Sequence, residues 1–403
     1  RLLDNLNSDL LVAFEFENFD LTRNVDISFV ASTNVTVSTF GLTRSVGFGG
    51  AGVGLFRNTS VDRMNFIVTQ RSALTIEGGE RAEFLRIRDD AAALRTISQS
   101  RFLVLGTSRV TVVSDTRLIL APAGALGVAV MNFSTARLVH AAVLIASSRI
   151  NITSTAATSG STTVAADAVL GWITHAHNCS IAVIDGSAVL VATTAGTVSV
   201  WVWGLATIVS HFSFILSGAS NVLLSNLGRG ADQSVHAFYA KSRANVSDAS
   251  VVITEGSQLS VNAGSGAFVL SASEGASVLT RMVVVVHGGS HIHMKATMGK
   301  LFAFSQAAVI NVTCSVRGSS VTVLAQTATF FQVVGSVVRH VLVAIGAGSN
   351  VTLRQRADSF YSSNFFTFDT GSLRASALVV FEGSYVGVDS GAAAAVAVLI
   401  DRS

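Results

Sequence analysis

Short runs in which apolar and polar residues alternate recur along almost the whole chain of 403 residues. Clear copies are MVVVVHGGS (282–290), HVLVAIGAGS (340–349) and SALVVFEGS (376–384), each of which ends in a small residue and a serine. A second alternating run follows the serine, as in SHIHM (290–294) and SNVTL (349–353). Period-two alternation rich in Val, Ile, Thr and Phe predicts β-strands, and the Gly, Ser, Asn and Asp residues between the runs predict turns.

Aligned on this serine, the pattern occurs eleven times. The number of residues from one aligned serine to the next is smallest between Ser290 and Ser319 and is among the largest between Ser32 and Ser72. A third run, often opening on phenylalanine, completes the later repeats, as in LFAFSQ (301–306). One such repeat cannot bury its apolar face alone, but stacked repeats can. We therefore predict an all-β, right-handed parallel β-helix with three strands per turn and about eleven turns. The aligned serines are Ser32, Ser72, Ser108, Ser148, Ser187, Ser220, Ser257, Ser290, Ser319, Ser349 and Ser384.

The composition agrees with a chain made almost entirely of strands. Pro122 is the one proline, and proline cannot donate a hydrogen bond to a sheet. No proline-rich, charged or low-complexity linker interrupts the repeat, so residues 1–403 are predicted to form a single solenoid. Because the chain begins with Arg1 and ends without a polar cap, we expect this solenoid to be a segment of a larger protein.

The apolar set of each alternating run is expected to point into the solenoid. Phenylalanine outnumbers tyrosine and tryptophan by 24 to 6, and its ring brings no polar atom that needs a partner in a core. An exposed phenylalanine platform for a ligand is the alternative. The residues predicted to point inward and to stack on equivalent residues one turn away are Val321, Val323, Val351, Leu353, Phe304, Phe331 and Phe366.

Eight sequons for N-glycosylation are the strongest chemical signal. In INVTCSV (310–316) and NVTL (350–353) the asparagine alternates with the apolar residues, so it should face solvent. A chain rich in Asn, Ser and Thr also generates sequons by chance, and asparagines at strand starts can form ladders. The predicted acceptors are Asn34, Asn58, Asn132, Asn151, Asn178, Asn245, Asn311 and Asn350.

Histidines and cysteines give weaker signals. His175, His177 and Cys179 could form a row on one strand, and His291 with His293 forms a second pair, but a turn expected near His177 would break the row. We therefore predict no metal site and no cofactor. Cys179 and Cys314 belong to turns too far apart for a disulfide, and Cys314 is predicted to be buried.

Three further histidines, His140, His211 and His340, occupy the same slot before the serine, but two and four turns separate them, which is too far for a shared site.

The acidic residues do not form a catalytic cluster in the sequence. Enzymes that cleave acidic polysaccharides on this fold need Asp side chains that converge with a basic group. Asp89 and Asp90 are the one adjacent pair, and the others are scattered among turns, where we interpret them as turn residues: Asp232, Asp248, Asp358, Asp369 and Asp389. A net charge of +3 gives no footprint for nucleic acid. The apolar stretches 118–136 and 186–228 are interpreted as strands rather than membrane spans.

The units GSNVTL, EGSQLSV and RGSSVTVL, the density of sequons, the preference for Arg over Lys and the scarcity of proline resemble the dispersed gene family surface proteins of trypanosomatid parasites. The resemblance covers nearly the whole chain but rests on repeat consensus. It implies very large glycosylated proteins with pectate-lyase-like β-helical ectodomains and a role in adhesion to host matrix. It supplies no catalytic residues to transfer to this sequence.

Together these features predict a non-catalytic, glycosylated ectodomain at the cell surface or secreted, adhesive or structural in role. Its expected partner is a host or matrix protein or glycan, with no nucleic acid, and with membrane attachment only through regions outside this segment. The alternative is a polysaccharide lyase or hydrolase on the same scaffold, which a structure would support by showing three or more converging Asp, Arg or Lys side chains.

Overall fold

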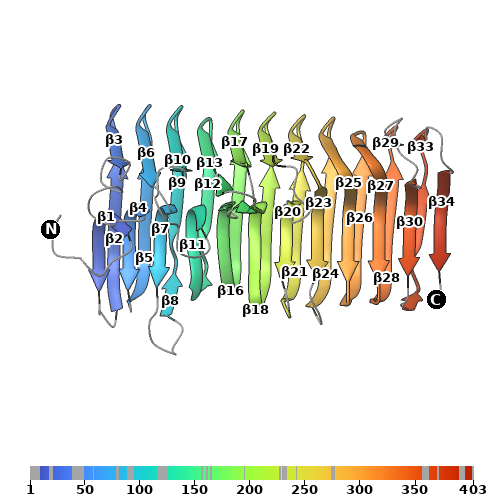
Figure 1. Ribbon diagram of the computed structural model, residues 1–403, viewed down its shortest axis with the longest axis horizontal. Coiled ribbons are helices and arrows are strands. Elements are labelled where there is room, and N and C mark those ends of the chain that lie inside the picture. Colours follow the sequence, from blue (N-terminus) through green and yellow to red (C-terminus); the bar gives the residue numbers. More distant parts are fainter. Residues whose placement is uncertain are drawn as a thin grey trace.

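The chain folds into a rod of stacked strands, with the N-terminus at one end and the C-terminus at the other (Figure 1). This computed structural model is a parallel β-helix: within the described residues, all strands but one short hairpin belong to one hydrogen-bonded system whose strand pairs run parallel. The structure describes residues 10–17, 21–38, 50–57, 59–78, 81–88, 95–115, 126–155, 158–159, 162–163, 166–194, 196–226, 228, 234–241, 243–273, 277–355, 363–369, 372–389 and 395–401.

Three strand positions follow one another in every turn, so each turn contributes to three parallel sheets along the rod. The first sheet contains β1 (Leu10–Glu17), β4 (Gly50–Arg57), β7 (Arg81–Arg88), the first parts of β11 (Leu126–Val139), β16 (Ala166–Ile184) and β18 (Val198–Leu216), β20 (Ser234–Lys241), β23 (Gly266–Ser273), the last parts of β25 (His291–Ser305) and β27 (Ser320–Val334), β30 (Ser363–Asp369) and β34 (Ala395–Asp401).

The second sheet contains β2 (Leu21–Phe29), β5 (Ser60–Val68), β8 (Arg95–Ser98) with β9 (Arg101–Leu105), the end of β11 with β12 (Ala142–Ala146), the last parts of β16 and β18, β21 (Asn245–Ile253), β24 (Ser277–His287), β26 (Ala307–Arg317), β28 (Val337–Gly346), and β31 (Ser372–Arg374) with β32 (Ala377–Val380).

The third sheet contains β3 (Asn34–Ser38), β6 (Ala73–Gly78), β10 (Arg109–Asp115), β13 (Arg149–Thr155), β17 (Ala188–Thr193), β19 (Asn221–Asn226), β22 (Gln258–Ala263), the first parts of β25 and β27, β29 (Asn350–Gln355) and β33 (Tyr385–Asp389). An antiparallel hairpin of β14 (Thr158–Ser159) and β15 (Thr162–Thr163) lies outside the three sheets.

The aligned serines form a continuous hydrogen-bonded ladder inside the rod. From Ser108 to Ser349, the backbone N–H of each serine donates to the hydroxyl oxygen of the serine one turn further on, over distances between 3.1 and 3.4 Å. The small residue before most of these serines is explained by the corner there, where Gly256, Gly289 and Gly348 have positive φ. The serine that marks the repeat in the sequence therefore also joins consecutive turns.

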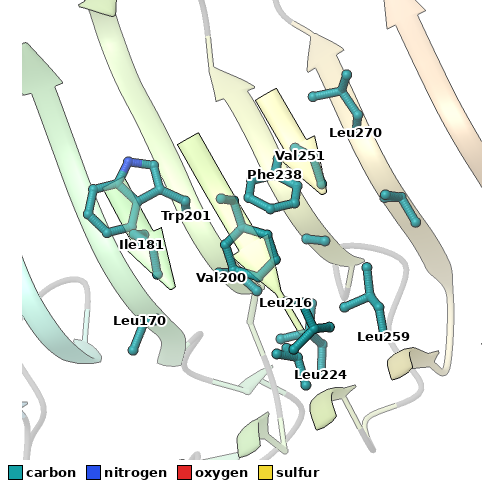
Figure 2. Packing of buried hydrophobic residues seen from close by; sticks show 14 of the residues in the cluster. Leu170, Ile181, Val200, Trp201, Leu216, Leu224, Phe238, Val251, Leu259 and Leu270 are labelled. Carbon is teal, nitrogen blue, oxygen red and sulfur yellow. The ribbon is translucent and has the colours of Figure 1, made fainter. Parts of the chain in front are cut away.

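Alternation places the apolar side chains in one continuous core, as Figure 2 shows for Trp201, Phe238, Leu216 and Leu259. The inward orientation predicted from the sequence is confirmed, because six of the seven named residues are buried and Phe366 is partly buried against the core. Phe304 contacts the ring of Phe331 in the next turn, with centroids 5.4 Å apart, but it is not in the same register position, because it pairs with Val333. Phe302 occupies the position equivalent to Phe331, and Phe366 follows it in the next turn.

The sequence left this register ambiguous, because Phe302 and Phe304 both point inward on β25, two residues apart, and alternation allows either of them to lie opposite Phe331. Each strand of the first sheet from β18 to β30 also has two consecutive residues that point inward, so the alternation slips by one within the strand. In β25 these residues are Leu301 and Phe302, and in β27 they are Phe330 and Phe331, all of them buried. The strand bends at this point, and the outer residues on either side of the bend are three positions apart instead of two.

A second column of corner residues runs along the outside of the second sheet. Each member has positive φ and lies next to the member from the preceding turn, as the pairing of the flanking strand residues shows. Most of these side chains are polar and exposed. We call this set the corner column: Asn24, Arg63, Gln99, His140, Asn178, His211, Asp248, Arg281, Asn311, His340 and Ala375.

Candidate functional site

A pocket of about 330 Å³ opens on the outer face of the first sheet, over β20, β23, β25 and β27 in the yellow to orange part of Figure 1. Its side chains come from four successive turns, so the stacking of the turns assembles it. We call it the Lys300 pocket. It is lined by Ser234, His236, Tyr239, Ser265, Gly266, Phe268, Ser271, Ala272, Met298, Lys300, Ala303, Phe304, Ser305, Gln332 and Val334.

Register places three of these residues in one row along the rod. His236 pairs with Phe268, and Phe268 pairs with Lys300. The His236 and Phe268 rings stack with centroids 4.6 Å apart, and Lys300 Nζ lies 5.8 Å from the centroid of Phe268. Tyr239, on the other side of the strand bend, stacks on His236 at 4.3 Å. The result is a rigid wall of three rings with an ammonium group at its end.

His236 is buried and both of its ring nitrogens have partners. Nδ1 lies 2.5 Å from the Ser271 hydroxyl, and Nε2 lies 2.7 Å from the Ser234 hydroxyl. Burial lowers the pKa of His236 to about 3. The imidazole is therefore neutral at neutral pH, and its role in the pocket is to hold the rings and the two serines in place.

Lys300 supplies the positive charge of the pocket. The side chain is half-buried, and this burial lowers the pKa of its ammonium group. Among the described residues that line the pocket there is no aspartate or glutamate. A partly buried ammonium group beside neutral residues is electrostatically suited to an anion, because a partner charge would offset its loss of hydration.

A second hollow, of about 400 Å³, lies on the second sheet near the N-terminal end. It is lined by Asn24, Asp26, Arg63, Asn65, Gln99, Arg101 and His140. Asn65 Nδ2 donates to Asp26 Oδ1 over 2.7 Å, so acidic and basic groups are mixed there. This mixture of charges gives no preference for one kind of ligand.

Three histidines lie together on the outside of the second sheet. His177 contacts the rings of His140 and His211, with centroids 5.9 and 5.4 Å away. His140 and His211 are two turns apart, as predicted from the sequence, but the prediction missed that His177 lies between them. Asn178 Nδ2 donates a hydrogen bond to His140 Nδ1 over 2.8 Å. Both of these residues belong to the corner column.

The row of His175, His177 and Cys179 is broken by the corner at Asn178, as the sequence indicated. His177 is exposed, whereas Cys179 is buried. His291 and His293 do share the outer face of β25. Among the residues that the structure describes, no group of three or more His, Cys, Asp or Glu side chains is arranged to hold a metal ion.

Both cysteines are free thiols inside the rod, and the predicted burial of Cys314 is confirmed. Burial raises the pKa of Cys179 to about 11 and that of Cys314 to about 12. Because the thiolate is the reactive form, both groups are poor nucleophiles at neutral pH.

Most of the predicted glycosylation acceptors lie on the outside of the rod. Asn151 is half-buried, Asn58 lies outside the described residues, and Asn132 lies in β11. Asn178 and Asn311 occupy the corner column. The exposed acceptors are Asn34, Asn178, Asn245, Asn311 and Asn350.

Of the acidic residues singled out from the sequence, the three in the described part of the chain, Asp248, Asp369 and Asp389, do not lie in a shared site. Asp248 makes a bidentate ion pair with Arg281, with Oδ–N distances of 2.6 and 2.7 Å, and this hydrogen bonding lowers the pKa of Asp248. Asp369 and Asp389 belong to different sheets, in β30 and β33. The residues Asp89, Asp90, Asp232 and Asp358 lie outside the described part of the chain.

The described part of the chain contains no helix long and apolar enough to cross a membrane. Comparison with known proteins adds no relative: no protein-family model, no curated protein and no solved structure matches this chain.

Proposed function

We propose that this chain is a non-catalytic, glycosylated ectodomain of a cell-surface or secreted protein, which acts by binding a matrix protein or glycan along the rod. The observation that supports it best is the outward placement of the sequons, since five of the six acceptors with described side chains are exposed. Glycans attached there would project from the rod without disturbing the core.

A rod of this kind suits binding better than turnover. The turns repeat the same backbone, and the corner column places one side chain per turn at a spacing of roughly 4.8 Å. Weak contacts repeated along such a surface add up through multivalency. The same repetition works against catalysis, which needs several groups converging on one substrate atom.

The Lys300 pocket gives a reason to consider a second candidate function, that of a polysaccharide lyase. A lysine with a lowered pKa is a candidate general base for removing the proton next to a carboxylate. Such a reaction also needs a second cation or a metal to stabilise the negative charge that develops on the carboxylate. In the described part of the chain, the pocket lining contains one cationic side chain, Lys300, so binding is the function that we favour.

The test of the proposal is to express the segment through a secretory route and map its glycans by mass spectrometry. We expect glycan at Asn311 and Asn350, and we expect Asn311→Gln to lower the mass by one glycan. Asn221→Gln is the matched control, because Asn221 is exposed on β19 but has no sequon. Secreted protein without glycan at any exposed sequon would contradict the proposal.

Turnover is tested separately, by incubating the protein with acidic polysaccharides and following chain length and the absorbance of unsaturated products. We expect no depolymerisation. Cleavage that is lost in Lys300→Met would establish the lyase instead.

A further inference from the structure

We propose that the Lys300 pocket binds a small hydroxylated carboxylate, of the size of one sugar acid. The inference deepens the proposed binding function and rests on it, because it gives that function a ligand class and a place on the rod. It is carried by the geometry of four successive turns, which brings one ammonium group, a rigid ring wall and several hydroxyl and amide groups to one opening.

The charge of the pocket matches a single negative charge. Of the described residues in the lining, Lys300 is the one with a cationic side chain, and the imidazole of His236 is neutral. A phosphate monoester carries close to two charges and is usually bound by several cationic donors or by the planar fork of arginine. Lysine is a compact point charge, and the chain uses it at three positions only, Lys241, Lys295 and Lys300. A carboxylate is therefore the anion that fits.

The rest of the lining favours a ligand with hydroxyl groups. Ser305 and Gln332 add a hydroxyl and an amide group to the lining, and Gly266 and Ala303 in the same lining have small side chains. Hydroxyl and amide groups exchange hydrogen bonds with alcohols in either direction, because each can donate and accept.

The volume limits the ligand to one ring. About 330 Å³ is at the lower end of the range for small-molecule sites, which is roughly 300–1,000 Å³. Gly266 matters for this space, because a Cβ there would lie 2.8 Å from Cε2 of Phe268 and would push the ring wall. The pre-formed wall also lowers the entropy cost of binding, since its rings are already packed on one another.

The experiment measures binding of glucuronate, glucose and glucose 6-phosphate to the purified, folded segment by calorimetry or ligand-observed NMR. We expect glucuronate to bind at least tenfold more tightly than glucose and more tightly than glucose 6-phosphate. Lys300→Met should weaken glucuronate binding tenfold or more. Lys295→Met is the matched control, because Lys295 is an exposed lysine on the same strand, β25.

Folding does not confuse the result. Lys300→Met removes a half-buried charge for which the described lining residues supply no acidic partner, so the melting temperature is expected to stay the same or rise. Equal binding of glucose and glucuronate, or glucuronate binding that survives Lys300→Met, would overturn the proposal. Preference for the phosphate would overturn the ligand class. Glycan mapping tests other residues than this pocket. A negative result in the binding experiment therefore leaves the proposal of a glycosylated ectodomain intact, and a negative result in the glycan mapping leaves the binding result at the pocket intact.

Discussion

The serine ladder provides the sharpest test of how consecutive turns are held together, and Ser187 is the residue to change. Its hydroxyl oxygen accepts from the N–H of Ser148 over 3.2 Å, and its own proton is donated to the carbonyl of Ile184 over 2.5 Å. The side chain is fully buried, so water cannot replace it. Alanine at this position leaves a buried N–H without a partner.

The expected cost follows from these contacts. An unsatisfied buried donor costs about 1–3 kcal/mol, and loss of the hydroxyl's own hydrogen bond adds about 1 kcal/mol. The small cavity left by one oxygen atom contributes little beside these terms. Ser187→Ala should therefore lower the free energy of unfolding by about 2–4 kcal/mol.

The matched control is Ser250→Ala. Ser250 is half-buried on the outside of β21, and among the described residues its hydroxyl bonds to the hydroxyl of Ser213 alone, over 3.2 Å. No buried backbone group loses a partner, so the change should stay within about 0.5 kcal/mol.

Two measurements together decide the matter. Urea unfolding gives the free energy, although a long repeat array can unfold in more than one step. Amide hydrogen exchange reports the N–H of Ser148 directly, and its protection should fall in Ser187→Ala and not in Ser250→Ala. An unchanged exchange rate at Ser148, together with a free energy of unfolding within about 0.5 kcal/mol of the parent protein, would refute the role given to the ladder.

Two further predictions concern the pocket wall and the core. The folded-state pKa of His236, about 3, lies below the ordinary value of 6.5. The free energy of unfolding is therefore unaffected by this group above pH 6.5 and decreases as the pH falls from 6.5 towards 3. The total decrease is roughly 5 kcal/mol. Urea titrations at about pH 7 and about pH 5.5 should show that the free energy of unfolding decreases by about 1.4 kcal/mol per pH unit in the parent protein but not in His236→Phe. An equal dependence of the free energy of unfolding on pH in the two proteins would contradict this prediction. Gly171→Ala should destabilise the rod by about 1–3 kcal/mol, because the new Cβ would lie 2.0 Å from Cζ3 of Trp201. Trp201→Leu should relieve that clash in the double variant, and a melting temperature that shows no such coupling would count against the contact.

Repetition made much of the fold predictable from the sequence. The alternation on either side of each serine predicts strand, corner and core face together, and residues such as Val321 and Leu353 are buried as expected. Phe304 shows the limit, because Phe302 and Phe304 both point inward on the same strand, and alternation does not reveal which of them lies opposite Phe331.

The Lys300 pocket could not be found from the sequence for a related reason. Lys300 follows its ladder serine, Ser290, more closely than His236 follows the corresponding serine, Ser220. Turns of unequal length hide the fact that the two residues are in one row, and only the pairing of the strands aligns them. The corner column is equally hidden, because its members share a backbone conformation and not a residue type.

The ladder also has a consequence for how a gene encoding this rod can change. Every rung joins a serine to the corresponding serine of the next turn, although the turns differ in length from 29 to 40 residues. Recombination that removes or duplicates one whole repeat, such as the stretch from Gln258 to Ser290, recreates the same kind of rung at the junction. Deletion of part of a repeat leaves strands out of step. Rod length is therefore a trait that can evolve in whole-turn increments, while variation within a turn is confined to the loops between its strands.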